Sequence, residues 1–404
     1  MNTNYLYLLR TYKYITALLW CCIHAWWHSP CYAQTQLPEL RYNGLNYVCT
    51  DSSLFYGAQS IKQSGIEDLR AKLQLFKNML TAKGFTDAVI TSKEVRPANR
   101  PLIERLQQLG ILQNNVMPDS QQLVQHIKQA QHLFDLEKDG VIGKASLIAF
   151  NTPLAVRIRE LELAINTFEW LGCAISEQSV IVVNIPSANL KLFENGQMVL
   201  HSNIICGKPY TPTSTLAAPI TEVILYPYWN VPYNIATKEL LPQIKKSRSY
   251  LDANNLQVVN SAGKVVDPGS INWQALSRSN FPYRLRQATG CDNSLGIVKL
   301  NFHNPFTIYM HDTPTKSLFG RRKRFFSHGC MRVEKAMELA RHMLTDTQPI
   351  DDIETEGCLK YQSPVVIPLQ KKAAVFVLYN TAWTDEAGDV HFYGDAYNKI
   401  NDVP

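Results

Sequence analysis

The chain has 404 residues, of which 46% are hydrophobic and 18% are charged, and its formal net charge is +6. This composition excludes a largely disordered chain and one dominated by membrane-spanning segments, and the length calls for two or three domains. The mild positive excess does not indicate a nucleic-acid partner, and we predict none.

The first segment has the features of an export signal. Arg10 and Lys13 precede an apolar run over residues 15–27, and Cys31-Tyr32-Ala33 offers a small-residue cleavage site. We predict that residues 1–33 are a signal peptide and that the mature protein is exported to the periplasm or cell envelope. The run is short for a membrane span, so we expect membrane association only through an uncleaved leader.

Helical patterns follow the leader. Residues 34–95 form an N-terminal helical region, with the clearest pattern over 66–80 and no chemical motif. Residues 96–153 predict a small three-helix domain, with helices over 102–109 and 121–133 and a third opening after 139–143. A linking helix is predicted within residues 154–179.

From residue 180 the pattern changes to short runs of strand-forming residues. The dipeptide Asn195-Gly196 separates two of these runs and is a strong hairpin signal. We therefore predict that residues 180–404 form a mainly β catalytic domain with an insertion over residues 233–292, which is polar and partly helical. The predicted strands cover residues 180–185, 188–193, 198–206, 220–225, 298–300, 365–369 and 374–379.

A reactive cysteine is predicted at Cys330, within the run Ser327-His328-Gly329-Cys330-Met331-Arg332. The apolar spacing over residues 333–344 predicts a helix that Cys330 would open, where unpaired amides and the helix dipole favour an anion. We therefore expect the pKa of the thiol to lie below its free value of roughly 8.5. Amides around Gly329 and Cys330 are candidates for holding a tetrahedral oxyanion.

His311 is the predicted base. It ends a strand-like stretch in which Ile308 and Met310 face the core, while Tyr309 and His311 face the opposite side. A histidine facing a cleft beside a thiol is the arrangement expected for covalent acyl transfer. His328 is the weaker candidate, because a residue two positions before the nucleophile turns away more easily.

These residues carry a resemblance to a known family. Residues 293–344, with His-Asp-Thr-Pro at 311–314 and Ser-His-Gly-Cys-Met-Arg at 327–332, resemble the YkuD-type catalytic domain of L,D-transpeptidases. The similarity extends to residues 227–232 and Tyr397. The fold that it implies is multidomain α+β: a mainly β sheet or sandwich with a catalytic helix, a peptidoglycan-binding-like domain over 96–153, and a capping subdomain over 233–292. Ala130 and Asp135 depart from the binding module's usual pattern.

The resemblance also implies a reaction and its partners. Cys330 would attack a tetrapeptide donor stem of peptidoglycan and release terminal D-alanine, and an acceptor stem would complete a 3→3 cross-link. His311 would move the proton, with Gly329 and His328 in the catalytic motif. Arg332 would pair with a substrate carboxylate. The remaining predicted substrate-binding residues are Tyr309, Ser327 and Trp229. No cofactor or metal is expected, and carbapenems are the expected inhibitors.

Other functions remain open at this stage. Water as the acceptor would make the protein an L,D-carboxypeptidase, and a protein lysine would make it an enzyme that attaches proteins to peptidoglycan. A zinc site built from His303, His311, His328 and Cys330 is a different class of function. A non-catalytic wall-binding protein is the fourth alternative.

Six cysteines follow the predicted leader, and export favours disulfide formation. Because a catalytic thiol cannot be bridged, at most two disulfides are expected among the other five, with their pairing left open. These five are Cys49, Cys173, Cys206, Cys291 and Cys358.

Overall fold

The computed structural model of the protein describes residues 40–42, 45–49, 64–83, 89–91, 93–171, 179–195, 197–358, 363–371, 373–385, 387 and 389–400. The chain divides into two compact units. Unit 1 comprises residues 1–177, 195–197 and 380–404, and unit 2 comprises residues 178–194 and 198–379. The predicted catalytic domain ran to residue 404, whereas this division assigns the last segment to unit 1. The predicted leader lies outside the described residues.

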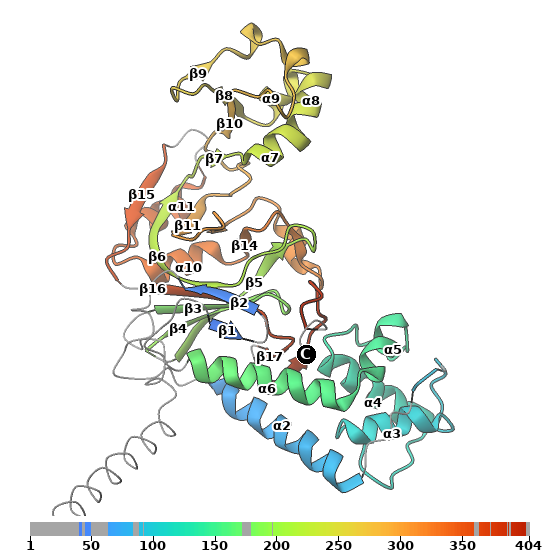
Figure 1. The fold of residues 1–404 in the computed structure, drawn as a ribbon. Coiled ribbons are helices and arrows are strands. Elements are labelled where there is room, and N and C mark those ends of the chain that lie inside the picture. Colours follow the sequence, from blue (N-terminus) through green and yellow to red (C-terminus); the bar gives the residue numbers. More distant parts are fainter. Residues whose placement is uncertain are drawn as a thin grey trace, which may run out of the picture. The chain divides into compact units, whose positions relative to one another are not determined.

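Unit 1 is mainly helical (Figure 1). Its described helices begin and end close to the predicted positions. The start of α4 shows why, because the Asp119 side chain accepts from the amide of Gln122 while the Gln122 side chain accepts from the amide of Asp119. No described helix has both the length and the apolar character needed to cross a membrane. The bounds are α2 Ser64–Lys83, α3 Arg100–Gln108, α4 Ser120–Leu133, α5 Lys144–Asn151 and α6 Leu154–Leu171, with strands β1 Leu40–Tyr42 and β2 Leu45–Cys49.

An aromatic core joins the helices of unit 1 to a C-terminal hairpin, β17 Ala382–Thr384 and β18 Val390–Phe392. Phe392 contacts Phe76 of α2 and Phe134 at the end of α4, with ring centroids 6.1 and 6.0 Å apart. The Arg157 guanidinium lies 4.8 Å from the rings of Phe134 and Phe392 and pairs with Glu160 at 2.8 Å. The charge is therefore buried with a partner, as a stable interior requires. The likeness of residues 96–153 to a peptidoglycan-binding module stays a prediction.

Unit 2 is built on strands that pair in a closed circuit, in the order β6-β11-β12-β14-β5-β4-β3-β16 and back to β6. All six residues of β16 are buried, which fits their continuous apolar sequence and parallel pairing with β3. The circuit strands are β3 Ser179–Asn184, β4 Asn189–Glu194, β5 Gln197–Gly207, β6 Leu216–Leu225, β11 Val298–Phe302, β12 Met310–His311, β14 Met331–Val333 and β16 Ala373–Leu378.

The remaining elements of unit 2 flank this circuit. Strand β13 pairs with β5 and β15 pairs with β6. Two helices follow the predicted catalytic motif. The bounds are β13 Phe325–Ser327, α10 Ala336–Met343, α11 Gln348–Glu356 and β15 Val365–Pro368, with a short 3-10 helix at Lys316–Gly320.

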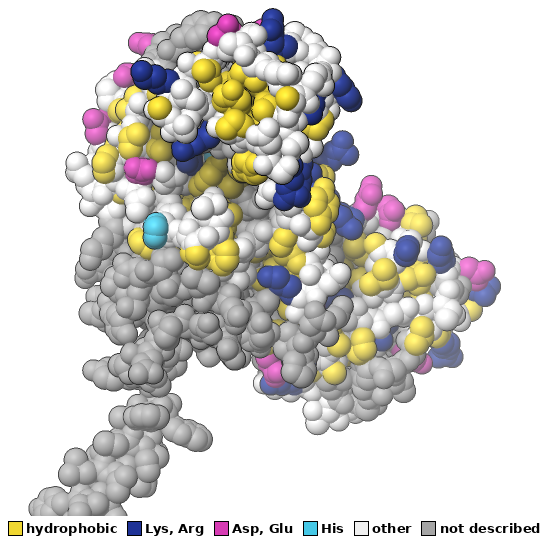
Figure 2. Space-filling view, turned by 45° about the horizontal axis from the view of Figure 1, so that its top comes forward, with side chains coloured by type: hydrophobic (Ala, Val, Ile, Leu, Met, Phe, Trp, Pro, Cys, Tyr) yellow, Lys and Arg dark blue, Asp and Glu magenta, His cyan; other side chains and the backbone are white. Residues whose placement is uncertain are grey.

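The predicted insertion has a sheet and a hydrophobic core of its own, which includes Leu241, Val258 and Trp273. Apolar side chains also gather on its surface in Figure 2, and Tyr233 and Val265 are among its exposed apolar residues. The elements are β7 Trp229–Asn230, α7 Tyr233–Ile235, a π-helix Ala236–Leu240, α8 Leu241–Lys246, α9 Ser249–Ala253, β8 Leu256–Val259, β9 Val265–Val266, 3-10 helices at Pro268–Ser270 and Trp273–Ala275, and β10 Arg284–Gln287.

A disulfide joins Cys291, just after the insertion, to Cys358, just after α11. It links positions 67 residues apart, and closing a loop of this length restricts the unfolded chain by about 4 kcal/mol. Cys206 and Cys330 are free thiols. Burial raises the pKa of Cys206 to about 12, so this thiol is an inert core residue.

Candidate active site

Strand register places the predicted catalytic residues on one face. In the parallel pair of β12 and β14, Met310 pairs with Met331 and His311 pairs with Arg332. Met310 and Met331 are fully buried. Because side chains alternate along a strand, the residues on either side of each methionine face the opposite way. Tyr309 and His311 thus share a face with Cys330 and Arg332, and the rings of Tyr309 and His311 lie 5.6 Å apart.

The prediction that Cys330 opens a helix is wrong. Cys330 lies in the turn between β13 and β14, and helix α10 begins only at Ala336. Residues 331–333, which carry a helical apolar pattern, instead pair with β12 on one side and β5 on the other. Two ladders of backbone hydrogen bonds outweigh the local pattern here. Arg332 accordingly lies on a strand, and the thiol lies outside the first turn of α10.

The nucleophile turn is closed by its own polar atoms. The buried Ser327 hydroxyl donates to the carbonyl of Cys330 at 2.5 Å and accepts from the amide of Gly329 at 3.1 Å. Gly329 has a φ of +118°, which favours glycine, and its carbonyl accepts from Thr213 at 2.9 Å. Ser327 therefore shapes the turn rather than facing a substrate. The Gly329 amide already donates to the Ser327 hydroxyl, so its role as an oxyanion donor stays a prediction.

The sulfur of Cys330 is held by Tyr309. The backbone amide and the hydroxyl of Tyr309 both donate to it, and the Trp229 side chain donates to the Tyr309 oxygen. Burial, together with the neighbouring sulfur, raises the pKa of Tyr309, so its hydroxyl keeps its proton for donation. Tyr309 thus contacts the nucleophile itself, a contact that the sequence reasoning did not predict.

Two cations lie beside the sulfur, and one of them was not predicted. Lys299 of β11 pairs across the strands with His311, and its Nζ lies 4.2 Å from the centre of the Tyr309 ring. Arg332 is the second cation. Burial lowers the pKa of both side chains, while the nearby Cys330 acts to raise it. The sequence feature that could have indicated this cation is the position of Lys299 inside an otherwise apolar strand.

The pKa of the Cys330 thiol lies above its ordinary value, contrary to prediction. Burial raises the pKa of Cys330, although the two donors of Tyr309 and the charges of Lys299 and Arg332 act to lower it. Desolvation of the anion is the larger effect, because the sulfur is mostly removed from water. A thiolate at this position thus has its stabilising groups in place, but it has to be formed by removal of the proton.

His311 is suited to that removal. Burial and the positive charges of Arg332 and Lys299 lower the pKa of His311 to about 3. Hydrogen bonds to the carbonyls of Asp312 and Leu295 act to raise this pKa. The ring is therefore neutral at ordinary pH. Nδ1 lies 2.5 Å from the Asp312 carbonyl, which can only accept, so Nδ1 carries the proton of the neutral ring.

The loop after His311 is fixed by the next carboxylate. Asp312 is buried and accepts from the amide of Ile297 at 3.2 Å and from Lys316 at 2.5 Å. A Cβ on Gly296 would lie 2.2 Å from the Asp312 carboxylate, so only glycine permits this approach. The carbonyl that orients His311 is thereby held in place.

His328 contacts the insertion. Its exposed ring bonds to Glu239 of the insertion at 2.9 Å, and its place among the catalytic residues stays a prediction. The zinc alternative is not supported. Within the described part of the chain, the group of potential ligands that lies close enough together is His132, Asp385 and His391, and none of these belongs to the predicted set.

Comparison with known proteins finds a family model that matches the segment containing this site. Residues 178–367 match the YkuD family model, the L,D-transpeptidase catalytic domain. This confirms the resemblance for the catalytic domain. A Haemophilus influenzae protein provisionally named an L,D-transpeptidase is 35% identical over 211 residues, covering 52% of this chain and 42% of the relative. The match thus spans less than half of that relative's length.

Solved structures show weaker similarity. An L,D-transpeptidase from Mycobacterium smegmatis has 11% identity and a TM-score of 0.22, over 50% of this chain and 58% of that chain. The catalytic domain of the Enterococcus faecium L,D-transpeptidase has 13% identity and a TM-score of 0.22, over 50% of this chain and 98% of that chain. TM-scores of this size support no conclusion about the fold.

Proposed function

We propose that the protein is an L,D-transpeptidase that forms 3→3 cross-links in peptidoglycan through a thioester on Cys330. The observation that carries the proposal is the convergence on one strand face of a free thiol, a neutral buried histidine and two cations, inside the segment that matches the family. A thiol, a base and donors for the anion are the parts that covalent acyl transfer needs.

In the first step, Nε2 of His311 takes the thiol proton and the sulfur attacks the carbonyl of the third residue of a tetrapeptide stem. Lys299, Arg332 and the Tyr309 hydroxyl stabilise the sulfur as it gains negative charge. The carbon–nitrogen bond to the terminal D-alanine then breaks, and His311 returns the proton to the leaving amine. Among the described residues none accepts from the amide of Cys330, so this amide is the donor that we assign to the oxyanion.

In the second step, the side-chain amine of diaminopimelate on a neighbouring stem attacks the thioester carbonyl. The amine loses a proton, the carbon–sulfur bond breaks, and the thiol is restored through His311. Water or a protein lysine in place of that amine would give the carboxypeptidase or protein-attaching reactions. The reaction products distinguish these acceptors.

Substrate binding is assigned to Arg332 and Trp229. Arg332 supplies a guanidinium on the catalytic face, where a stem carboxylate can pair with it bidentately. Trp229 lies on β7, the first strand of the sheet in the insertion. Its side chain donates a hydrogen bond to Tyr309, which in turn donates to Cys330. The bond between His328 and Glu239 also joins the nucleophile turn to the insertion. These contacts support a capping role for residues 233–292.

Export, wall binding and carbapenem sensitivity complete the proposal. The disulfide between Cys291 and Cys358 supports an oxidising compartment outside the cytoplasm, as the predicted leader requires. Residues 96–153 are proposed to bind peptidoglycan. One L,D-transpeptidase among the similar solved structures is in complex with imipenem, and one from Mycobacterium tuberculosis carries a faropenem-derived adduct. We propose that carbapenems acylate Cys330 in the same way.

The direct test is incubation with purified disaccharide-tetrapeptide, with the products read by mass. Cross-linked dimer and free D-alanine are the expected products, and Cys330→Ala should give neither. Cys206→Ala is the matched control, because it removes the other cysteine that is free among the described residues. Tripeptide without dimer would replace the proposal by an L,D-carboxypeptidase. Full activity in Cys330→Ala would overturn it.

A further inference from the structure

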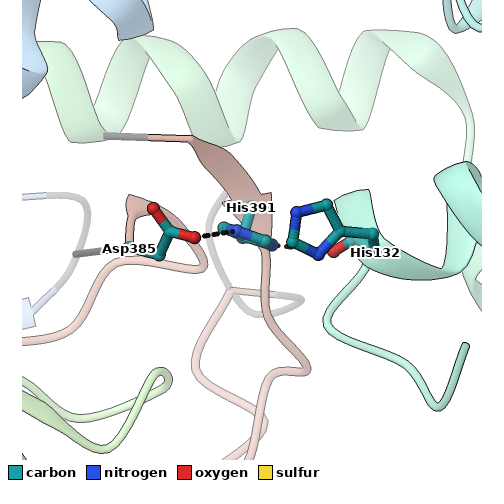
Figure 3. A group of neighbouring side chains, drawn as sticks. All are labelled: His132, Asp385 and His391. Carbon is teal, nitrogen blue, oxygen red and sulfur yellow. Dashed lines mark hydrogen bonds and ion pairs between the residues drawn. The ribbon is translucent and has the colours of Figure 1, made fainter. Parts of the chain in front are cut away.

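A second cluster of chemically active side chains lies in unit 1, within residues that the proposed reaction does not use. His132 is in the last turn of α4, Asp385 follows β17, and His391 lies within β18. Each offers a possible ligand atom, and these atoms all lie within 4.8 Å of one another. Figure 3 shows the His391 ring between the Asp385 carboxylate and His132.

The orientation of His391 is fixed by a backbone carbonyl. Its Nδ1 lies 2.7 Å from the carbonyl oxygen of His132, and His391 is only 5% exposed. A carbonyl oxygen only accepts, so Nδ1 carries a proton and Nε2 of the neutral ring presents a lone pair. This is the outer hydrogen bond that metal-binding histidines make almost always, because it selects the tautomer and holds the ring.

The Asp385 carboxylate is oriented in a similar way. Its Oδ1 accepts from the amide of Asp389 at 2.9 Å, which directs Oδ2 to Nε2 of His391 at 3.0 Å. A carboxylate oxygen and an imidazole lone pair both accept, so a cation or a proton must lie between them. Two ligand atoms at zinc distances of roughly 2.0–2.2 Å lie about 3.3–3.6 Å apart in a tetrahedron, a few tenths of an ångström more than the 3.0 Å between these two atoms.

His132 supplies a third position. Its ring meets the His391 ring edge-on, with centroids 4.6 Å apart, and its side chain is 44% exposed, so it has room to turn. The Asp389 carboxylate lies 3.7 Å from Nε2 of His132 and could add a further ligand. We infer that His132, Asp385 and His391 form a binding site for a divalent transition metal of the zinc class.

The donor set decides the class of metal. Two imidazoles and a carboxylate suit zinc and its neighbours, whereas calcium and magnesium require oxygen ligands. The ligands come from α4 and from the β17–β18 hairpin, two segments 259 residues apart at His132 and His391. A bound ion would therefore join the hairpin to the helical part of unit 1. Its role is structural and independent of the proposed acyl transfer.

The test uses the full chain with Cys330→Ala in every sample, so that the reactive thiol cannot bind the metal. Zn²⁺ alone is titrated by calorimetry, and Co²⁺ replaces it for visible absorption, which reports the coordination geometry. We expect one tight equivalent of Zn²⁺. Binding should weaken at least tenfold in His132→Gln and in Asp385→Asn, because loss of a direct ligand exceeds the 10- to 100-fold effect of an outer partner.

His126→Gln is the matched control, since His126 lies on the same helix and bonds to Gln129 instead. It should bind Zn²⁺ as the parent does. If Asp385→Asn does not fold, the result for His132→Gln tests the inference alone. The His132 side chain is nearly half exposed, so its replacement should not prevent folding. Equal binding by the parent and His132→Gln would overturn the inference. Absence of Zn²⁺ binding by the parent would also overturn it and leave His391 and Asp385 as a hydrogen-bonded pair.

Discussion

Two buried histidines, one in each unit, begin from the same local arrangement. His311 and His391 are both 5% exposed, and each places Nδ1 on a backbone carbonyl, at 2.5 and 2.7 Å. The other side chains near the two rings carry opposite charges. Lys299 and Arg332 lie near His311, whereas the Asp385 carboxylate bonds to His391.

The difference shows how the charge of neighbouring side chains determines whether a buried imidazole acts as a base or binds a cation. Cations and burial together lower the pKa of His311 to about 3, so its ring stays neutral and can accept a proton from a thiol. At His391 the Asp385 carboxylate instead faces Nε2 at 3.0 Å, where the proposed metal ion would bind both groups. The first arrangement makes a base, and the second makes a cation-binding site.

The largest expected effect is on activity, and it distinguishes His311 from His328. His311→Gln should reduce cross-linking about 10²- to 10⁴-fold, the range for loss of a general base. His328→Gln should reduce it less than about tenfold, because that ring is exposed and bonds to Glu239. Initial rates of dimer formation measure both. A larger loss in His328→Gln than in His311→Gln would exchange their roles.

The second prediction concerns stability. The pKa of His311 is lowered in the fold, so between about pH 6.5 and 3 the unfolded chain binds a proton that the native protein does not. The free energy of unfolding should therefore fall with decreasing pH. From pH 7 to pH 5 this histidine should contribute a loss of about 2 kcal/mol. Denaturant unfolding of the parent and of His311→Gln at both pH values measures it, and an equal loss in the two would contradict the assignment.

Reversing one charge should make His311 resemble His391. Lys299→Glu places a carboxylate on the strand next to His311, which should raise the pKa of that ring by about one unit or more. The ring resonances of His311 during a pH titration by NMR report the change. Lys299→Met is the control, because it removes the cation without adding an anion, and should give a smaller rise. No rise in either variant would show that Lys299 does not act on His311.

The smallest predicted effect concerns the contact with the sulfur. Tyr309→Phe removes the hydroxyl that donates to Cys330 but keeps the backbone donor, so the rate of acylation should fall about five- to tenfold. Tyr210→Phe is the matched control, because its ring is 76% exposed. Stopped-flow mixing with a carbapenem measures the rate. Unchanged acylation in Tyr309→Phe would remove the hydroxyl from the mechanism.

Local signals in the sequence predict the helices of unit 1 and most of the longer strands of unit 2. The predicted helix over residues 121–133 corresponds to α4, and the apolar run at 374–379 corresponds to the buried strand β16. In both, the pattern within one segment agrees with the packing around it. The alternation that places Tyr309 and His311 opposite Met310 is confirmed for the same reason.

The active site was predicted less well, because contacts distant in sequence determine it. Residues 331–333 have a helical pattern but pair between β12 and β5. Lys299 reaches the site only through its pairing with His311. The cluster of His132, Asp385 and His391 likewise joins positions that share no motif. Register between separate segments cannot be read from the spacing within one segment.

The mass of a trapped acyl-enzyme tests the central claim most directly. After brief incubation with imipenem or with a tetrapeptide donor, the intact protein should gain the mass of one acyl group, and peptide mapping should locate it on Cys330. Cys206→Ala should gain the same mass, and Cys330→Ala should gain none. An adduct on another residue, or donor turnover that persists in Cys330→Ala, would contradict the account.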